Sequence, residues 1–266
     1  MTNDNAKWRL LIDVMARLRG ENGCPWDLEQ DHHSLKKYLL EEAYEVLDAI
    51  DAADDAALCD ELGDVLLQVV FHARLAEERG AFAIDDVLDA VNSKMIRRHP
   101  HVFGSDTADD AKAVLHSWEL IKAEEKRGKT NAGKPARIMQ LNDNLPALML
   151  AQKAQDKAAR VGFDWPDASG ARAKVDEELQ ELAAAGSAEQ RRDEFGDLLF
   201  SVVNMARFAG IDAEDALRHA AHKFCRRFDY VERRVQEQGG AWSNYDLAAL
   251  DRFWNEAKED EAHEIG

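Results

Sequence analysis

The sequence predicts an all-α protein built from two similar helical domains in tandem. Three observations lead to this prediction: helical periodicity of the apolar residues, only 5 prolines in 266 residues, and an internal repeat of one acidic pattern. The pattern reads E-E-x-x-E, then a gap, then E-[LF]-G-D and an apolar run. It occurs at residues 41–64 and again at 177–197. A repeat of this kind indicates two copies of one domain rather than one large core.

The apolar periodicity places helices in a similar order in both halves of the chain. In the first half, the expected helices span residues 7–19, 35–50, 57–79, 84–98 and 108–126. In the second half, they span residues 146–160, 171–185, 188–209, 213–238 and 246–260. Ser187 with Gln190, and Asp27 with Gln30, resemble the capping pairs that begin helices.

The repeat divides the chain into an N-terminal helical domain over residues 1–127, a linker over 128–145 and a C-terminal helical domain over 146–266. Gly128, Gly133 and Pro135 interrupt the linker, which is polar and locally basic.

Charge and composition exclude several classes of partner. The formal net charge of -18 disfavours binding to nucleic acid or to an anionic membrane. The apolar runs at residues 65–71 and 198–206 are shorter than the roughly 18–20 residues that a membrane span needs. Three cysteines without C-x-x-C spacing indicate reduced thiols, and the first residues lack an apolar signal segment. We therefore expect a cytoplasmic protein.

The acidic pattern predicts converging carboxylates. Residues three apart on a helix point the same way, so Glu42 converges with Glu45, and Glu61 with Asp64. A short turn makes their helices antiparallel neighbours, whereas Glu41 faces solvent. The second copy carries Glu178, Glu181, Glu194 and Asp197.

Four such carboxylates repel one another by about 1 to 4 kcal/mol per pair at roughly 4 Å, depending on the dielectric. They must be protonated, paired with Lys or Arg, or bound to a cation. Because no His or Cys joins either set, the ligands suit Mg²⁺, with Mn²⁺ as a substitute, better than zinc. The alternative is an ordinary charged face of an acidic helix. That alternative accounts poorly for two copies set into apolar helices.

The helices that carry the second acid pair are apolar around most of their circumference, so we expect them to be largely buried. Gly63 and Gly196 occupy the same place in the two copies and cost about 1 kcal/mol each relative to alanine in a helix. Their shared place predicts a close approach of another backbone.

A basic face also recurs. Lys94, Arg97 and Arg98 lie on one helix face, and their counterparts are Lys223, Arg226 and Arg227. Cations near a helix C-terminus explain the first set, but the second lies within a helix that is expected to continue. Next to an acidic metal site, a basic face suggests a polyphosphate ligand.

Each half of the chain also contains a tryptophan followed by a lysine four residues later. These pairs are Trp118 with Lys122 and Trp254 with Lys258. The tryptophan suits stacking on a nucleobase and the lysine suits a phosphate, although a packing tryptophan under an extended lysine explains the pair equally well. Asn204 has no such repeat.

The counterpart of Asn204 is Phe71, the clearest difference between the copies. An amide at this place could hydrogen-bond the edge of a base, which favours the C-terminal half as the active one.

These residues resemble the MazG family, the tandem-domain nucleoside triphosphate pyrophosphohydrolases of the all-α NTP pyrophosphatase superfamily. The resemblance covers nearly the whole chain and is carried by Gly23-Cys24-Pro25-Trp26-Asp27, Leu40-Glu41-Glu42-Ala43-Tyr44-Glu45, Glu61-Leu62-Gly63-Asp64, Arg97-Arg98-His99-Pro100-His101-Val102-Phe103, Leu145-Pro146-Ala147-Leu148, Val161-Gly162-Phe163-Asp164-Trp165 and Glu194-Phe195-Gly196-Asp197-Leu198-Leu199-Phe200.

The resemblance implies two MazG-like helical bundles that assemble across the subunits of a homodimer. It implies Mg²⁺-dependent hydrolysis of NTP or dNTP to NMP or dNMP and pyrophosphate. It places metal ligands at Glu42, Glu45, Glu61, Asp64, Glu178, Glu181, Glu194 and Asp197, and triphosphate contacts at Lys223, Arg226 and Lys258. The two halves need not both be active in this family. Because Asn204 favours the C-terminal half, we expect Glu178, Glu181, Glu194 and Asp197 to be the catalytic set.

No Ser, Cys or His is placed as a nucleophile, so we expect attack by a metal-activated water, or by a water with Glu178 or Glu181 as general base. The alternative function is a non-catalytic helical dimer that binds a nucleotide or a regulatory protein partner. A purely structural helical bundle is a third function that fits the same helices.

Overall fold

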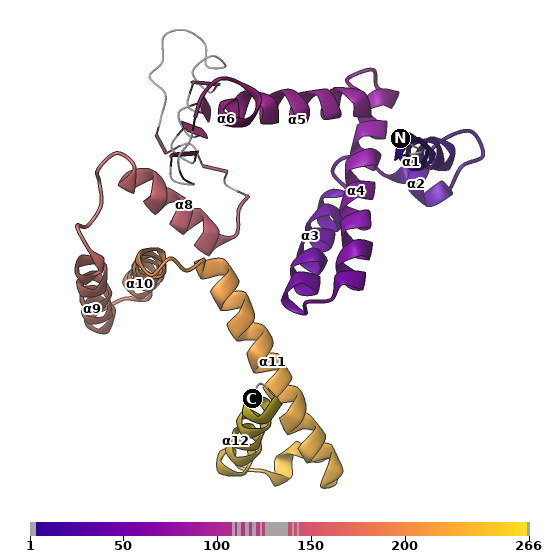
Figure 1. Ribbon diagram of the computed structural model, residues 1–266. Coiled ribbons are helices and arrows are strands. Elements are labelled where there is room, and N and C mark those ends of the chain that lie inside the picture. The colour runs from indigo at the N-terminus through magenta and orange to yellow at the C-terminus, as the bar shows by residue number, and fades with distance from the viewer. Residues whose placement is uncertain are drawn as a thin grey trace. The chain divides into compact units, whose positions relative to one another are not determined.

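The computed structural model describes residues 4–107, 110, 113–114, 117–118, 121–122, 124–125, 138–139, 141–142 and 144–264. Every regular element in these residues is a helix, which confirms the predicted all-α fold class. The chain divides into two compact units, Met1–Lys134 and Pro135–Gly266 (Figure 1). The linker predicted at 128–145 lies largely outside the described residues, and its bounds stay a prediction.

The described part of the N-terminal unit contains four long helices and two short ones. Its elements are α1 (Asp4–Leu18), α2 (Pro25–Glu29), α3 (Lys36–Asp51), α4 (Asp55–Glu78), α5 (Ile84–Arg98) and α6 (Pro100–Phe103). The expected capping pair at Asp27 and Gln30 is wrong, because Asp27 lies inside α2 and Gln30 follows its end. Pro25 begins α2, where its missing N–H costs nothing. The helix expected at 108–126 falls largely outside the described residues.

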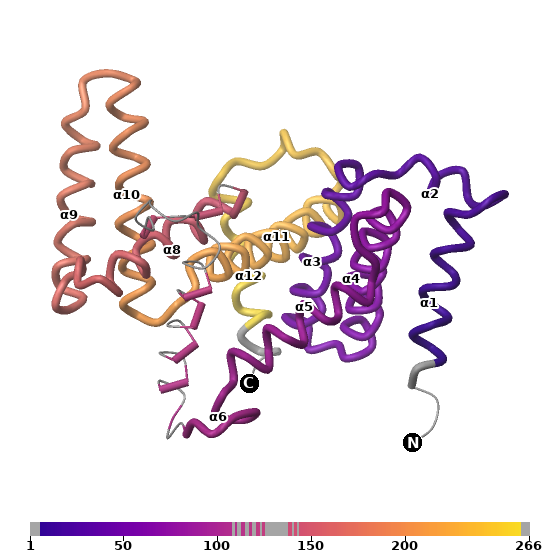
Figure 2. Tube along the Cα trace, turned by 90° about the horizontal axis from the view of Figure 1, so that it is seen from above, coloured from indigo at the N-terminus to yellow at the C-terminus, as the bar shows by residue number. Residues whose placement is uncertain are grey.

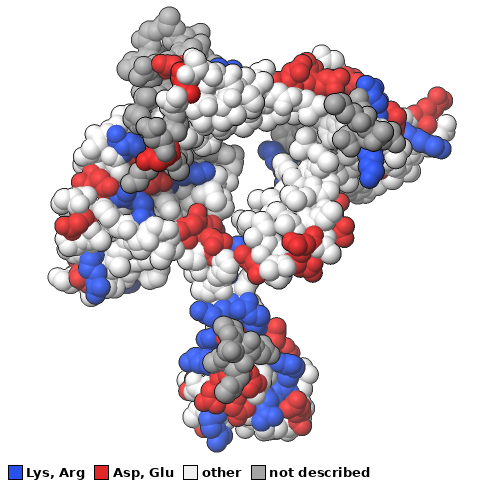
Figure 3. All heavy atoms as spheres, viewed as in Figure 1, with Lys and Arg blue, Asp and Glu red and all other residues white. Residues whose placement is uncertain are grey.

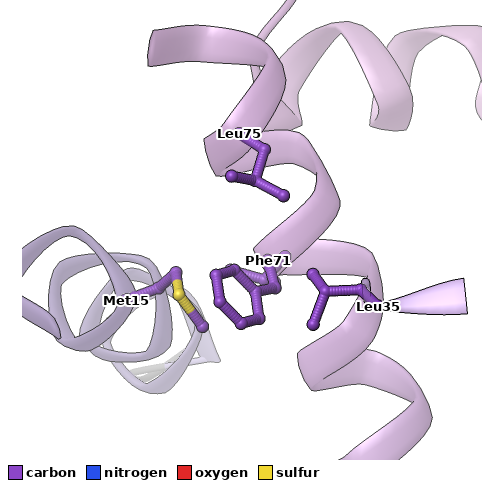
Figure 4. Packing of buried hydrophobic residues seen from close by; sticks show 5 residues of the cluster. Met15, Leu35, Phe71 and Leu75 are labelled. Carbon is purple, nitrogen blue, oxygen red and sulfur yellow. The ribbon is translucent and has the colours of Figure 1, made fainter. Parts of the chain in front are cut away.

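The core of the N-terminal unit lies where α1 meets α4 and the start of α3. Figure 4 shows the Phe71 ring of α4 between Met15 of α1 and Leu35, which precedes α3, with Leu75 further along α4. Phe71 is 3% exposed and Leu35 is fully buried. This packing fixes the C-terminal half of α4, and α4 also pairs with α3.

The C-terminal unit contains a second long hairpin. Its elements are α8 (Ala147–Ala159), α9 (Ala168–Ala184), α10 (Ala188–Phe208), α11 (Ala213–Glu237), the 3₁₀ turn η1 (Trp242–Asn244) and α12 (Leu247–Glu264). Figure 2 shows α9 and α10 side by side. The predicted cap of α10 is confirmed, because the Ser187 hydroxyl accepts from the Gln190 N–H at 3.1 Å and the Gln190 side chain accepts from the Ser187 N–H at 3.2 Å.

A separate pair of helices ends the C-terminal unit. Figure 1 shows α11 leading away from the α9–α10 hairpin, with α12 packed beside its second half. Val231 and Val235 of α11 and Phe253 of α12 form the buried core of this pair. The prediction that α11 continues past its basic residues is confirmed, since the helix ends at Glu237.

Neither α4 nor α10 is buried all round, so that prediction is wrong within each unit. Leu62 and Leu66 on α4 are exposed, and Leu199 on α10 is 47% exposed. A Cβ added to Gly63 or Gly196 would meet no atom within 4 Å, so the expected close backbone approach is also absent from the described part of each unit. A two-helix hairpin covers only one side of each helix. We call these uncovered apolar sides the open faces of α4 and α10.

The cysteines Cys24, Cys59 and Cys225 are free thiols, as expected. Among the described helices, none combines the length and the apolar character that a membrane crossing requires.

Candidate active site

Three carboxylates of the C-terminal unit converge between α9 and α10. Glu178 on α9 and Glu194 and Asp197 on α10 each offer an oxygen, and these oxygens lie within 4.8 Å of one another. We call these three residues the C-terminal acid cluster. Glu181, about one turn further along α9, is exposed and lies outside this set. The structure therefore brings together three of the four predicted ligands.

Glu178 is the buried member of the cluster, with 3% of its surface exposed. Its Oε1 lies 2.6 Å from Lys174 Nζ, whereas its Oε2 is buried without a hydrogen-bond partner among the described residues. Hydrogen bonds to Glu177 and Glu178 raise the pKa of Lys174, so its ammonium stays charged. Burial, followed by repulsion from Glu181 and the other nearby carboxylates, raises the pKa of Glu194. One ammonium thus leaves the cluster with excess negative charge.

The orphaned oxygen is the feature that fits a cation. A buried carboxylate oxygen without a donor is costly, and coordination to a metal ion would satisfy it. The donors in the cluster are all carboxylate oxygens, which suit hard divalent ions such as Mg²⁺ and Mn²⁺.

A similar set forms in the N-terminal unit. Oxygens of Glu42 and Glu45 on α3 and of Glu61 on α4 lie within 4.8 Å of one another, and Asp64 lies outside this N-terminal acid cluster. Burial, followed by hydrogen bonding to Glu45, raises the pKa of Glu42, and burial followed by the charge of Glu45 raises that of Glu61. Gln68 Nε2 donates to Glu42 Oε1 at 3.5 Å, so the donor here is a neutral amide rather than an ammonium.

A cleft of about 640 Å³ opens beside the C-terminal acid cluster. Its volume lies in the range of about 300–1,000 Å³ that is typical of small-molecule sites. Glu178, Asp197 and Lys174 contribute to its wall. Aromatic and polar side chains complete the wall: Phe163, Trp165, Phe200, Gln155, Ser201, Asn204 and Arg207. The cleft therefore joins carboxylates to an apolar surface large enough for a nucleoside.

Asn204 lies in this wall and is held by an arginine. Arg207 Nε donates to Asn204 Oδ1 at 3.0 Å, and a terminal nitrogen of Arg207 donates to Asp164 Oδ1 at 2.5 Å. The hydrogen bond from Arg207 holds the pKa of Asp164 below its ordinary value, so this carboxylate stays charged.

The equivalent position in the N-terminal unit is filled. Phe71 stands where Asn204 stands in the repeat, and its ring belongs to the core around Met15 (Figure 4). An aromatic ring packed there removes both the polar group and the space beside it. The N-terminal acid cluster thus has a buried phenylalanine ring at the position where the cleft of the C-terminal unit has the Asn204 amide.

The predicted basic residues of the C-terminal unit lie on α11 and α12, and they do not line the cleft. Arg227 pairs with Glu261 at 2.7 Å, and its guanidinium lies 5.8 Å from the Trp254 ring centre. Lys258 Nζ donates to Asn255 Oδ1 at 3.3 Å. Figure 3 shows Lys and Arg interleaved with Asp and Glu over this pair of helices.

Two of these basic residues stand apart. Lys223 and Arg226 have no hydrogen-bond or ion-pair partner among the described residues. Their positive charges are therefore available to an anionic ligand.

The N-terminal basic residues are engaged differently. Arg97 and Arg98 both pair with Glu125 at 2.5 Å, and hydrogen bonds from Arg98 and Arg97 hold the pKa of Glu125 at about 2. Arg98 and Lys122 each lie 5.8 Å from the Trp118 ring centre, and Lys94 lies on α5. Arg97 is therefore bound internally, whereas its counterpart in the C-terminal unit is not.

Four residues line the cleft without having been predicted as site residues: Lys174, Asp164, Gln155 and Arg207. Lys174 could have been found, because it precedes Glu178 by four residues and so shares its helix face. The other three reach the cleft from α8, from the loop before α9 and from the end of α10, and no spacing along one helix connects them.

The chain matches the MazG nucleotide pyrophosphohydrolase domain twice, over residues 30–103 and 169–231. The chain belongs to this family. The two matches contain all eight predicted acids and both predicted basic triplets. Trp118, Lys122, Trp254 and Lys258 lie outside them, as does Asp164.

Relatives named nucleoside triphosphate pyrophosphohydrolase are similar over 60–94% of the chain. The nucleoside triphosphate pyrophosphohydrolase/pyrophosphatase MazG of Thermotoga maritima is 48% identical over 93% of this chain and 94% of its own length. The nucleoside triphosphate pyrophosphohydrolase of Escherichia coli K12 is 44% identical over 94% of this chain and 97% of its own. A protein of the same name from Mycobacterium tuberculosis is 39% identical over 60% of this chain and 48% of its own.

Proposed function

We propose that this chain hydrolyses nucleoside and deoxynucleoside triphosphates to the monophosphate and pyrophosphate, with Mg²⁺ bound at the C-terminal acid cluster and Mn²⁺ as a substitute. The observation that carries the proposal is the buried, unpartnered Oε2 of Glu178, which lies next to two further carboxylates at the wall of a cleft. The family and the names of the similar proteins support the reaction class.

Each acidic residue has a role in this proposal. Glu178, Glu194 and Asp197 would hold the ion, which supplies positive charge to the phosphates and increases the acidity of water. Glu181 is exposed beside this set, so it is placed to accept a proton from the attacking water as general base. The water oxygen bonds to phosphorus, the anhydride bond between the α- and β-phosphates breaks, and pyrophosphate departs.

Positive side chains would offset the charge that develops on the pyrophosphate. Lys174 stays protonated at the cleft wall because its pKa is raised. Lys223 and Arg226 have free charges but lie on α11, outside the cleft lining. They act on the same triphosphate only if another copy of the chain brings them to it.

We therefore propose a homodimer in which a second copy covers the open faces. The exposed Leu62, Leu66 and Leu199, with open space beside Gly63 and Gly196, leave an apolar helix surface in each unit that a partner helix would bury. The alternative function, a non-catalytic dimer that binds a nucleotide or a regulatory protein partner, uses the same surfaces. The cytoplasmic location stays a prediction from the sequence.

We assign turnover to the C-terminal unit. Three features favour it: Asn204 stands in place of Phe71, the ammonium of Lys174 lies beside Glu178, and Arg226 has no ion pair among the described residues. The N-terminal acid cluster is proposed as a second cation site without a wall for a nucleoside.

Product analysis tests the proposed reaction. The full chain is incubated with Mg²⁺ and each of a panel of NTPs and dNTPs, and the phosphate products are separated. Monophosphate with pyrophosphate is the expected result. Diphosphate with orthophosphate would contradict it, and binding without any product would favour the regulatory dimer.

Chelation of divalent ions with EDTA should abolish pyrophosphate release, and excess Mg²⁺ should restore it. Mg²⁺ should also raise the midpoint of thermal unfolding, because an ion that binds only the folded state stabilises it by about 2.7 kcal/mol at 100 times its dissociation constant. Sodium chloride at equal ionic strength serves as the control. Full activity after exhaustive chelation would exclude a metal at this cluster.

Replacement of Gly196 with alanine should weaken the proposed dimer. If the open face of α10 stays in water, alanine should instead stabilise the helix by about 1 kcal/mol with no change in association. If a partner helix lies against it, the added methyl group shifts the equilibrium towards monomer. Sedimentation of wild type and variant over a dilution series distinguishes the two, and a wild type that is monomeric at all concentrations rejects the dimer.

A further inference from the structure

The amide of Asn204 has a fixed orientation in the cleft. Its Oδ1 accepts from Arg207 Nε at 3.0 Å, and Arg207 is itself held by Asp164 at 2.5 Å with only 14% of its side chain exposed. A guanidinium has donors and no acceptor, so only the oxygen of the amide can face it. The network therefore determines which end of the Asn204 amide remains for a ligand.

The remaining end is the amino group. Asn204 Nδ2 has no hydrogen-bond partner among the described residues, and Asn204 lines the cleft. The Phe200 ring is part of the same wall and offers a surface on which a planar base can lie. An acceptor on the ligand would take the place of water at this NH₂ group, whereas a donor there would leave both groups unpaired.

We infer that Arg207 is a positioning residue that turns the amino group of Asn204 towards the nucleobase, so that the C-terminal site prefers bases with a carbonyl oxygen at the edge it meets over bases with an exocyclic amino group there. The inference rests on the proposed function and names the substrate class of the same site. Asp164 contributes by holding the guanidinium, since its depressed pKa keeps it charged.

The N-terminal unit shows the same arginine without this role. Arg74 occupies the place of Arg207 in the repeat, but it pairs with Glu77 at 3.2 Å and Glu78 at 3.0 Å. Phe71, in the place of Asn204, offers no polar group to hold. Arg74 therefore supplies a matched control within the chain.

The test compares nucleotides that differ at one edge. We expect the ratio of kcat/KM for UTP over CTP, and for ITP over ATP, to exceed one for the wild type. Asn204→Asp replaces the free amino group with a carboxylate oxygen, which accepts rather than donates, and should lower both ratios by about tenfold. Arg207→Met frees the amide to rotate, so both ratios should fall towards one, with KM rising more than kcat falls. Arg207→Lys keeps a positively charged hydrogen-bond donor without the planar guanidinium and should restore part of the preference.

The outcomes separate this inference from the proposed function. Arg74→Met should leave both ratios at the wild-type value. Wild-type ratios at or below one, or ratios unchanged in Asn204→Asp while pyrophosphate is still released, would overturn the inference and leave the hydrolase intact. No pyrophosphate from any wild-type reaction would overturn the proposed function instead. Far-UV circular dichroism checks folding, and if Arg207→Met does not fold, the comparison of Asn204→Asp with Asn204→Ala decides alone.

Discussion

Replacement of Glu178 with glutamine should lower the rate of pyrophosphate release by roughly a thousandfold or more, equivalent to about 4 kcal/mol of transition-state stabilisation. Glutamine keeps the shape of the side chain but removes the negative charge from the buried position in the C-terminal acid cluster. It also places an NH₂ group either next to the ammonium of Lys174 or towards the proposed cation. Glu194→Gln and Asp197→Asn should act in the same direction. Steady-state release of pyrophosphate from the full chain measures the effect.

The same charge change on an uninvolved face of α9 is the control for this loss. Asp176 lies two residues from Glu178 and is exposed, so the Asp176→Asn variant should retain wild-type activity. Glu181→Gln separates the proposed roles, because loss of a general base should reduce turnover while the stabilisation by Mg²⁺ persists. Wild-type turnover in Glu178→Gln, with helicity unchanged, would remove the C-terminal acid cluster from the reaction.

Truncation of Phe71 to alanine should cost the N-terminal unit about 3–5 kcal/mol of unfolding free energy. The ring is 3% exposed and packs against Met15, Leu35 and Leu75, so its removal leaves a cavity that these three elements cannot close without moving (Figure 4). Urea denaturation monitored by circular dichroism measures the change, taken from the transition of the N-terminal unit.

A neighbouring residue on the same helix shows whether the effect comes from burial. Val69 on α4 is 37% exposed, and Val69→Ala should cost well under 1 kcal/mol, in the range of about 0.5 kcal/mol that is usual for surface changes. Phe71→Asn, which copies the residue at position 204, should be at least as destabilising as alanine because it buries an unpaired amide. A loss below about 1 kcal/mol for Phe71→Ala would show that the core around Met15 is loosely packed.

The fold class and most helices could be predicted from the sequence because the signals are local. Apolar spacing gave α3, α4, α9, α10 and α11 with bounds that differ by a few residues. The five-residue helix α2 could not be predicted in the same way, because so short a helix does not show periodicity. The cap at Ser187 was correct, since its two partners are three residues apart.

The acid clusters were predictable for the same reason, and the cleft was not. Glu178 and the pair Glu194 and Asp197 follow from helical spacing and a short turn between two helices. Asp164 and Arg207 meet only because the loop before α9 folds back onto the end of α10, which is a tertiary contact between residues 43 apart. No pattern along one element carries that information.

The prediction that α4 and α10 are buried on all sides was incorrect for a different reason. An apolar circumference predicts that a helix is covered on every side, but it does not say by which chain. Leu66 is 39% exposed and Leu199 is 47% exposed in the described part of their units, and this exposure is the physical basis for the proposed dimer. Lys223 lies on α11, away from the cleft lining. In the proposed dimer, a second copy of the chain would bring this lysine to the triphosphate.

The three-residue turns at 52–54 and 185–187 also bear on how the chain acquires its structure. Closing so short a loop costs little entropy, so the two helices of each hairpin can pair as soon as the second helix is synthesised. The first hairpin has all of its partners by residue 78, long before the ribosome reaches the second. Folding of the monomeric units is therefore a fast, local event, and in the proposed homodimer the docking of the open faces would be the late step, whose rate depends on protein concentration.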